Sequence, residues 1–308
     1  MKDPAGLYRV DSDLTEVPPG LPLVAGLTGF ADAGAAVSQL GEHLRQELDN
    51  RMLVQFDNDE LLDYRARRPI IYFDQDHLTN YEPAKLALWL VKDDLGQPFL
   101  LLNGYEPDFQ WERFTDAVLQ LVEQLQVKST TWVHSIPMPV PHTRPIGVTV
   151  SGNRDELIDA MSIWRPHTQV PSNALHLMEY RLHRLGHPTT GFVLLIPHYL
   201  ADTEFPLAAV AALESISAAT GLIFPTDELR EAGRDFTAKI DSQVESNPEL
   251  ARLVSVLEER HDTYLQENPL PSPLTDEDGE LPSADEIAAE LQKFLAAQRG
   301  TDEDFPQF

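Results

Sequence analysis

The chain has 308 residues, no cysteine and a formal net charge of −27 at pH 7. An apolar content of 42% is enough for a substantial core, and the length suits one large α/β domain or two smaller ones. Nucleic acid and anionic membrane surfaces are poor partners for so acidic a chain, because their phosphates attract clustered Lys and Arg. The absence of cysteine excludes disulfides, thiolate metal sites and cysteine nucleophiles.

The first residues, Met1 to Gly6, lack the apolar core of a signal peptide. No apolar run approaches the roughly 20 residues that a membrane helix needs. Together with the lack of cysteine, this predicts a cytoplasmic protein without nucleic acid or membrane as a partner. We also expect no bound cofactor or metal.

The first informative segment is Gly29 to Gly34, which joins a strand-like run, Leu21 to Leu27, to a helical pattern that ends near Leu48. A strand, a glycine turn with a carboxylate and a helix form an α/β unit whose loop lies at the ligand-binding edge of a sheet. Asp32 is placed to cap the helix, which we favour, or to face a ligand. The glycine spacing matches neither a dinucleotide fingerprint nor a nucleotide phosphate loop.

Short apolar runs then alternate with amphipathic segments. The strand candidates are Ile70 to Phe73, Leu86 to Val91, Phe99 to Leu102, Trp132 to Ile136 and Phe192 to Ile196. Helical spacing predicts helices over Asp108 to Leu125 and Ser172 to Leu185. The alternation predicts an α/β fold, a three-layer sandwich around a largely parallel sheet.

From Thr226 onward the pattern becomes purely helical. One helix is expected behind Thr226 as its cap, and a second at Asn247-Pro248-Glu249, which combines a cap, a first-turn proline and an acid. We expect a helical hairpin over residues 226–266. Its interaction residues, on apolar stripes, are Phe236, Ile240, Leu250, Leu253 and Leu257. The alternative is that these stripes pack only against the chain's own core.

The predicted α/β core domain covers residues 1–225, and the hairpin over residues 226–266 is its appendage. Residues 267–308 are rich in Pro, Ser and acidic side chains, which predicts an acidic linker. Within that stretch, Ser283 and Glu286 form a capping box ahead of Ile287, Leu291 and Phe294. A short terminal helix is therefore expected there.

The candidate site residues follow the predicted strands. If the sheet is parallel, the loops after its strands open on one edge, where α/β proteins bind ligands. These loops carry Asp32, Glu106, Asp108, His134 and His198. Carboxylates and imidazoles can act as acid and base or hold a divalent metal. The alternative, which we favour, is that Asp108 caps a helix, Glu106 precedes a turn proline and the histidines are solvated.

Four prolines between Trp132 and Gly147 predict an extended arm. Such an arm can line a cleft or pack against another subunit. The alternative is a rigid connection within one subunit.

Three segments resemble the proteasome assembly chaperone 2 family, in its bacterial branch. They are Gly26 to Gly34 (GLTGFADAG), Asn103 to Trp111 (NGYEPDFQW) and Pro171 to Ala174 (PSNA), and the likeness runs from about Leu21 to Tyr264. The resemblance implies an α/β sandwich of the phosphorylase/hydrolase-like type with a helical appendage. It also implies homo-oligomers and a chaperone role toward proteasome subunits or another protein, without an established enzymatic activity.

The alternative function is a small-molecule-binding protein or a hydrolase/phosphorylase-like enzyme that uses the carboxyl edge of the sheet. Fold alone does not carry that function. Family members that dock on the proteasome often end in a hydrophobic residue, tyrosine and any residue. This chain has Gln307 at the tyrosine position, so we do not expect docking by its last residues.

Overall fold

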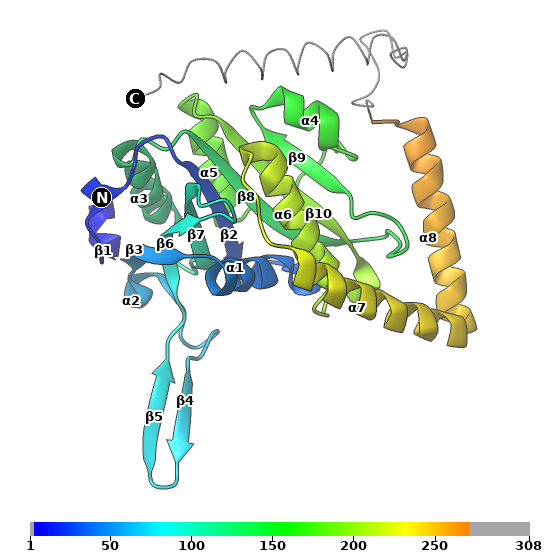
Figure 1. Cartoon of the computed structure of the whole chain (residues 1–308), viewed down its shortest axis with the longest axis horizontal. Coiled ribbons are helices and arrows are strands. Elements are labelled where there is room, and N and C mark those ends of the chain that lie inside the picture. Colours follow the sequence, from blue (N-terminus) through cyan, green and yellow to red (C-terminus); the bar gives the residue numbers. More distant parts are fainter. Residues whose placement is uncertain (1–2, 271–308) are drawn as a thin grey trace, which may run out of the picture. The chain divides into compact units, whose positions relative to one another are not determined.

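A mixed sheet with a parallel centre organises the fold. The computed structural model describes residues 3–270 (Figure 1). The strands of the large sheet are β1 (Tyr8–Val10), β2 (Pro22–Thr28), β3 (Asn50–Phe56), β6 (Leu86–Lys92), β7 (Pro98–Tyr105), β8 (Ser129–Met138), β9 (Val148–Gly152) and β10 (Thr189–Pro197). Their order is β1-β3-β6-β7-β2-β8-β10-β9. The central strands β7, β2, β8 and β10 run parallel, whereas the outer strands pair antiparallel.

Helices cover both faces of the sheet (Figure 1), which confirms the predicted three-layer α/β class. The longer ones are α1 (Ala36–Glu47) and α6 (Pro206–Thr220) on one face, and α3 (Trp111–Gln124) and α5 (Ala174–Arg184) on the other. Short elements in the connections are α2 (Asn58–Leu61), α4 (Asp155–Met161) and the 3₁₀ turns η1 (Pro4–Leu7), η2 (Leu14–Glu16), η3 (Ala33–Ala35) and η4 (His198–Leu200).

Two apolar clusters hold the layers together, one on each face. In β8, Trp132 belongs to the cluster under α3 and α5, and its neighbour Val133 belongs to the cluster under α1 and α6. Because the central strands are buried on both faces, their sequences read as continuous apolar runs. This explains why the runs from Phe99 to Leu102 and from Phe192 to Ile196 could be recognised.

The run Ile70 to Phe73, expected as a strand of the sheet, lies elsewhere, and that expectation was wrong. It belongs to a separate two-stranded hairpin of β4 (Ile70–Asp74) and β5 (His77–Glu82), which pair only with each other. The hairpin projects from the body (Figure 1), and nearly all of its residues are exposed. Hydrophobic periodicity predicts that a segment forms a strand, but it does not predict which strand pairs with it.

The start of α3 differs from the expected cap. Helix α3 begins after Gln110, which has a left-handed φ of 58° and gives no side-chain cap. Asp108 is therefore not the cap of this helix. In contrast, Asn173 caps α5 by accepting a hydrogen bond from the backbone N–H of His176 at 2.7 Å.

The two helices after Thr226 are α7 (Asp227–Ser246) and α8 (Pro248–Glu267). Asn247 caps α8, since its Oδ1 accepts hydrogen bonds from the backbone of Glu249 and Leu250. Thr226 precedes α7 but does not cap it with its side chain. Both helices belong to the compact unit that runs to Asn268, so the division into a core domain and an appendage remains a prediction.

The predicted terminal helix near Ile287 lies outside the described residues, and so does most of the predicted linker. Within residues 3–270, no helix combines the length and hydrophobicity needed to cross a membrane.

Gly191 of β10 provides a test of the packing between the sheet and α5. A Cβ at this position would lie 2.3 Å from ring atoms of Trp132, which is only 1% exposed. We expect Gly191→Ala to lower the free energy of unfolding by about 1–3 kcal/mol, because the buried indole has no room to move aside.

Urea denaturation followed by circular dichroism measures this effect. Gly6→Ala is the matched control, because a Cβ there would meet only the end of the Arg113 side chain, at 3.0 Å. Equal stability of Gly191→Ala and the wild type would contradict the packing described.

Candidate functional site at the carboxyl edge of the sheet

The parallel strands part from one another at their carboxyl ends. Pairing between β2 and β8 stops at Ala25 and Trp132, whereas β2 stays paired with β7 as far as Thr28 and Tyr105. The connection after β2 leads toward β3, and the connection after β7 leads to β8 on the other side. Such a reversal of direction in a parallel sheet is where ligands bind in many α/β proteins.

The carboxylate of Asp32 lies where β2 and β8 part and contacts both the start of α1 and β8. It accepts hydrogen bonds from the backbone N–H groups of Val37 at 2.8 Å and Ser38 at 2.9 Å, which lie in the first turn of α1. It also accepts a bond from the hydroxyl of Ser135 in β8 at 3.2 Å. Asp32 thus satisfies N–H groups that a helix start leaves open, and it ties the turn to the neighbouring strand.

The turn that carries Asp32 is conformationally strained. Ala31 and Ala35 have positive φ angles of 40° and 50°, and Gly34 has a φ of 68°. A left-handed conformation at alanine is costly and persists only where the surroundings impose it. The hydrogen bonds of Asp32 are such a constraint.

His134 is buried beside this turn. It is 3% exposed, and its ring stacks on Phe30 at a centroid distance of 5.7 Å and an interplanar angle of 10°. The pKa of His134 is lowered to about 4, mainly by burial and also by the nearby His176, while Asp32 acts in the opposite direction. Its Nε2 is buried without a hydrogen-bond partner in residues 3–270. The imidazole is therefore neutral at pH 7.

Glu106 and Asp108 are joined through Arg67, which the sequence analysis missed. Arg67 donates from Nη2 to the backbone oxygen of Glu106 at 2.7 Å and forms an ion pair with Asp108. The Glu106 carboxylate accepts from the backbone N–H of Ala174 at the start of α5, at 2.7 Å, yet burial outweighs this bond and raises its pKa. Asp108 accepts from the backbone N–H of Asp63 at 2.6 Å.

Gly29 connects the Arg67 group with the turn after β2. A Cβ on Gly29 would lie 3.0 Å from Nη1 of Arg67 and 3.3 Å from Cβ of Glu106. The guanidinium also lies over the ring of Tyr105, with 5.1 Å to its centroid. Four of the five candidates therefore lie around the turn after β2, residues 29–35: Asp32, Glu106, Asp108 and His134. Each carboxylate accepts backbone hydrogen bonds, as a residue that positions the loop would.

His198 lies apart from this group. It is exposed after β10, and its ring contacts Tyr199 edge to face at 5.4 Å. The hydroxyl of Tyr199 lies 2.6 Å from Nδ1 of the buried His142, whose Nε2 lies 3.1 Å from Asp241 of α7. His198 therefore borders the contact between the proline-rich arm and α7.

The proline-rich arm packs against the helices of its own chain. Arg144 donates to both carboxylate oxygens of Asp262 in α8, at 2.9 and 2.7 Å, and to Glu258 at 3.2 Å. This ion pair lowers the pKa of Asp262 to about 2. The arm thus holds α8 and, through His142, α7.

The five interaction residues predicted for the helical hairpin, which lie in α7 and α8, differ in exposure. Phe236 packs on Phe205 of the core at 5.4 Å, and Ile240 contacts the same cluster. Leu257 is 2% exposed, and Leu250 is half-buried. Leu253 is 37% exposed and leaves an apolar surface open. Part of the predicted stripe is thus used within the chain.

A buried polar group between α5 and the sheet also escaped the sequence analysis. Glu179 accepts hydrogen bonds from Trp132 Nε1 at 2.7 Å and Ser151 Oγ at 2.8 Å, and burial raises its pKa. A glutamate on the apolar stripe of Leu175 and Leu182 was the available signal. For Arg67 the signal was a cluster of arginines, Arg65 to Arg68, in an acidic chain.

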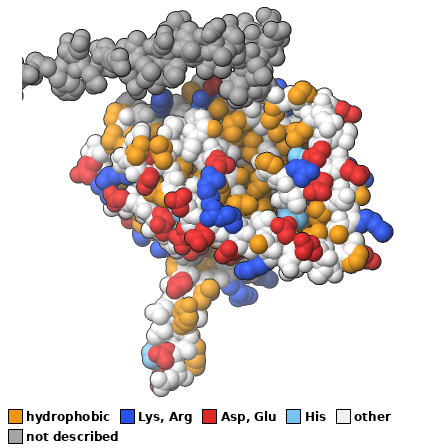
Figure 2. All heavy atoms as spheres, turned by 45° about the vertical axis from the view of Figure 1, so that its right-hand side comes forward, with side chains coloured by type: hydrophobic (Ala, Val, Ile, Leu, Met, Phe, Trp, Pro, Cys, Tyr) orange, Lys and Arg blue, Asp and Glu red, His pale blue; other side chains and the backbone are white. Residues whose placement is uncertain are grey.

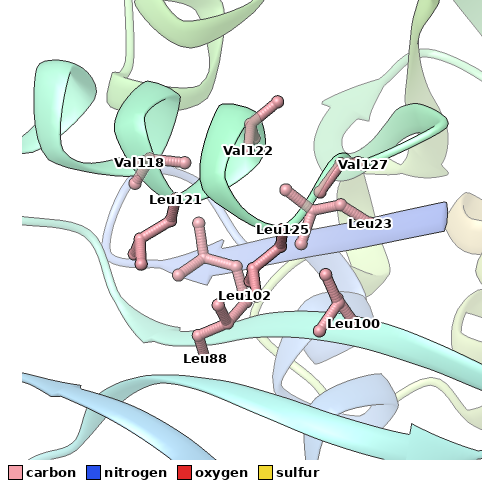
Figure 3. Close-up of a pocket in the computed structure, with 9 residues that line it drawn as sticks. All are labelled: Leu23, Leu88, Leu100, Leu102, Val118, Leu121, Val122, Leu125 and Val127. Atoms are coloured by element: carbon pink, nitrogen blue, oxygen red, sulfur yellow. The ribbon is translucent and has the colours of Figure 1, made fainter. Parts of the chain in front are cut away.

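None of the five candidates lines any of three cavities in residues 3–270, although Ser38, which donates to Asp32, lines one of them. One cavity, of about 10 Å³, lies between α3 and the sheet and is lined by nine Leu and Val side chains, which Figure 3 shows as sticks. It is a packing gap, because a water molecule needs polar partners there. Open clefts of about 570 and 540 Å³ lie beside α1 and at the amino edge of the sheet. Residues 3–270 contain no cluster of three acidic or histidine side chains able to hold a metal.

The fold and this edge define an α/β sandwich protein whose parallel strands end in a loop held by structural carboxylates. The chain belongs to the PAC2 family, whose family model matches residues 26–244. This confirms the family that the sequence segments indicated.

Two related solved structures are of proteins of unknown function. One, from Mycobacterium tuberculosis, is 42% identical, covers 85% of this chain and 92% of its own, and has a TM-score of 0.79. The other, from Corynebacterium glutamicum, is 33% identical, covers 85% and 99%, and has a TM-score of 0.80. A proteasome-assembly chaperone homologue from M. tuberculosis is 21% identical, with coverages of 76% and 100% and a TM-score of 0.70, and shares the fold. No curated protein matches the chain.

The burial of His134 predicts a dependence of stability on pH. Its pKa is about 4 in the folded protein and 6.5 as a free side chain, so the unfolded chain binds the proton more readily. Stability from this group is complete above pH 6.5 and is lost as the pH falls toward 4. Between pH 7 and pH 5 we expect the loss to be about 2 kcal/mol.

Denaturation of the wild type and His134→Phe at the two pH values measures this contribution. The variant should lose about 2 kcal/mol less than the wild type on acidification, because phenylalanine takes up no proton. His198→Phe, at an exposed position, is the control and should behave as the wild type does. Parallel losses in wild type and His134→Phe would contradict a neutral, buried His134.

Proposed function

We propose that this protein is an assembly-chaperone-like protein that binds other protein chains, forms homo-oligomers and acts in the cytoplasm. Membership of the PAC2 family supports the chaperone-like role. The hydrogen bonds of Asp32, Glu106 and Asp108 support it as well, because these carboxylates are committed to backbone groups. A chain without cysteine suits a reducing compartment.

The observation that carries the proposal is the apolar surface of the β4–β5 hairpin. Its large apolar side chains are 44–71% exposed: Ile70, Ile71, Tyr72, Phe73, Leu78 and Tyr81. Figure 2 shows hydrophobic side chains along this projection. In β4, successive apolar residues point to opposite faces, so both faces of the hairpin are apolar.

Physical chemistry argues that this hairpin is covered in solution. An isolated two-stranded hairpin is marginally stable in water, and its open edges offer unpaired backbone groups. Large exposed apolar surfaces mark interaction sites. We propose a second copy of this chain as the occupant, because every copy carries the same apolar hairpin and soluble homo-oligomers are closed and symmetric.

Light scattering after size-exclusion chromatography tests the self-association. We expect the wild type to be oligomeric and the double variant Phe73→Ser, Leu78→Ser to be monomeric, because these residues form a cross-strand pair on one face of the hairpin. The control is Leu185→Ser, since Leu185 is an exposed apolar residue on another element. A monomeric wild type would overturn this part of the proposal, and so would a double variant that remains oligomeric.

The second surface is the open side of α8. Leu253, Val256 and Tyr264 are 37–39% exposed and recur at helical spacing on one side of the helix. We propose that this stripe binds the client of the chaperone, with proteasome subunits as the expected clients. A fold neighbour is a proteasome activator from Pyrococcus furiosus, at 16% identity, which supports the fold and leaves the client to experiment.

Mass spectrometry of proteins that co-purify with a tagged copy, expressed at native level in its own host, tests the client. We expect proteasome subunits with the wild type and their loss with Leu253→Glu, Val256→Glu, because charges on the stripe prevent apolar burial. Leu95→Glu, at an exposed loop residue, is the control. Recovery of the protein alone would count against the client proposal, as would undiminished recovery with the double variant.

A further inference from the structure

A cleft of about 570 Å³ lies beside α1, where β6 and β7 continue the sheet beyond that helix. Its volume falls within the range of about 300–1,000 Å³ that is common for small-molecule sites. The lining side chains that bear on its chemistry are Glu42, Arg45, Lys85, Trp89, Asn103 and Tyr105. The cleft adjoins the turn of Asp32, because Ser38 also lines it and its hydroxyl donates to the Asp32 carboxylate at 2.5 Å.

The position of Arg45 in this cleft depends on a buried amide. Asn103 is 5% exposed and donates from Nδ2 to the backbone oxygen of Gly26 at 3.1 Å, just beyond the point where β2 parts from β8. Its Oδ1 accepts a hydrogen bond from Nη1 of Arg45 at 2.8 Å. The amide therefore serves two groups, a strand carbonyl and the guanidinium at the wall of the cleft.

A glycine within α1 makes room for this amide. A Cβ on Gly41 would lie 2.4 Å from Nδ2 of Asn103. Glycine inside a helix costs about 1 kcal/mol relative to alanine. Gly41 thus destabilises α1 slightly but leaves room for Asn103, whose hydrogen bond positions the guanidinium of Arg45.

The charges of the cleft suit a single negative charge. In residues 3–270, Arg45 and Lys85 form no ion pair with a carboxylate, although the chain has 50 acidic and 23 basic residues. Glu42, the acidic residue among the lining side chains, is bonded to Gln46 at 2.9 Å. The formal charge of the lining is thus +1, which matches a monoanion, and Glu42 would repel a second negative charge.

The shape of the guanidinium further restricts the chemical class of anion that fits the cleft. Arginine presents two parallel N–H groups that match the two oxygens of a carboxylate. Trp89 and Tyr105 add aromatic surface beside it. The indole Nε1 of Trp89 is buried without a hydrogen-bond partner in the described residues.

We propose that this cleft binds a small organic monocarboxylate with a flat apolar body. The carboxylate lies on Arg45 and near Lys85, and the apolar body lies against Trp89. This binding site shares no residue with the two surfaces of the proposed chaperone function, and its test is independent of theirs.

Titration of the full chain with benzoate, followed by calorimetry and ligand-observed NMR, tests the site. Benzoate should bind saturably, and neutral benzamide should bind at least about tenfold more weakly, since it lacks the charge-assisted hydrogen bonds. Phenyl phosphate should also bind more weakly than benzoate, because Glu42 opposes a second charge. No saturable binding of benzoate would overturn the proposal, as would tighter binding of benzamide or phenyl phosphate.

Variants locate the binding. Arg45→Gln should weaken benzoate binding at least about tenfold, because it removes the bidentate partner. Since Arg45 also bonds Asn103, Lys85→Gln provides a second test at an exposed side chain on the rim, with an expected loss of about threefold for a partly screened charge.

Lys128→Gln is the matched control, because Lys128 is an exposed lysine at the other open cleft. It removes the same charge and should leave the affinity for benzoate unchanged. Equal affinity of Lys85→Gln and Lys128→Gln would place the ligand elsewhere and overturn the assignment. Circular dichroism of each variant establishes that it is folded.

Discussion

The hydrogen bonds of Asp32 hold together the part of the molecule on which the rest depends. Past Ala25 the strands β2 and β8 no longer bond to each other, and the backbone turns sharply through residues with positive φ. Asp32 compensates by accepting from the first turn of α1 and from Ser135 of β8. The placing of Phe30 on His134, of Gly29 against Arg67 and of α1 over the sheet follows from this turn.

The acidic composition bears on the role of the carboxylates near the carboxyl edge of the sheet, which stabilise the fold. Glu106 accepts from the start of α5, and Asp108 accepts from the backbone of Asp63 and pairs with Arg67. The chain has about twice as many acidic as basic residues, so carboxylates are plentiful as ion-pair partners for each arginine. Arg67 and Arg144 consequently connect segments distant in sequence, whereas Arg45 is held by an amide and keeps its charge for a ligand.

The exposed surfaces of the molecule differ in chemistry and therefore in the partners they suit. The β4–β5 hairpin exposes large apolar side chains, and the open side of α8 carries three more, as protein-binding surfaces do. The cleft beside α1 is concave and carries opposite charges around an aromatic side chain, as sites for small molecules are. Binding at one does not require the other, so a protein that assembles chains and also responds to a small anion is physically consistent.

Local order was determined by the sequence alone. The apolar runs of β2, β7, β8 and β10, and the start of α8 at Asn247, depend on neighbours within a few residues. The shared edge of Asp32 and His134 could also be predicted, because parallel strands end together. Only the tertiary structure decided that Ile70 to Phe73 leave the sheet, that Asp108 bonds Arg67 and that Phe236 packs on Phe205. Periodicity records that one face of a segment is apolar, whereas the partner of that face lies far away in the chain and is selected by packing and hydrogen bonding across the whole fold.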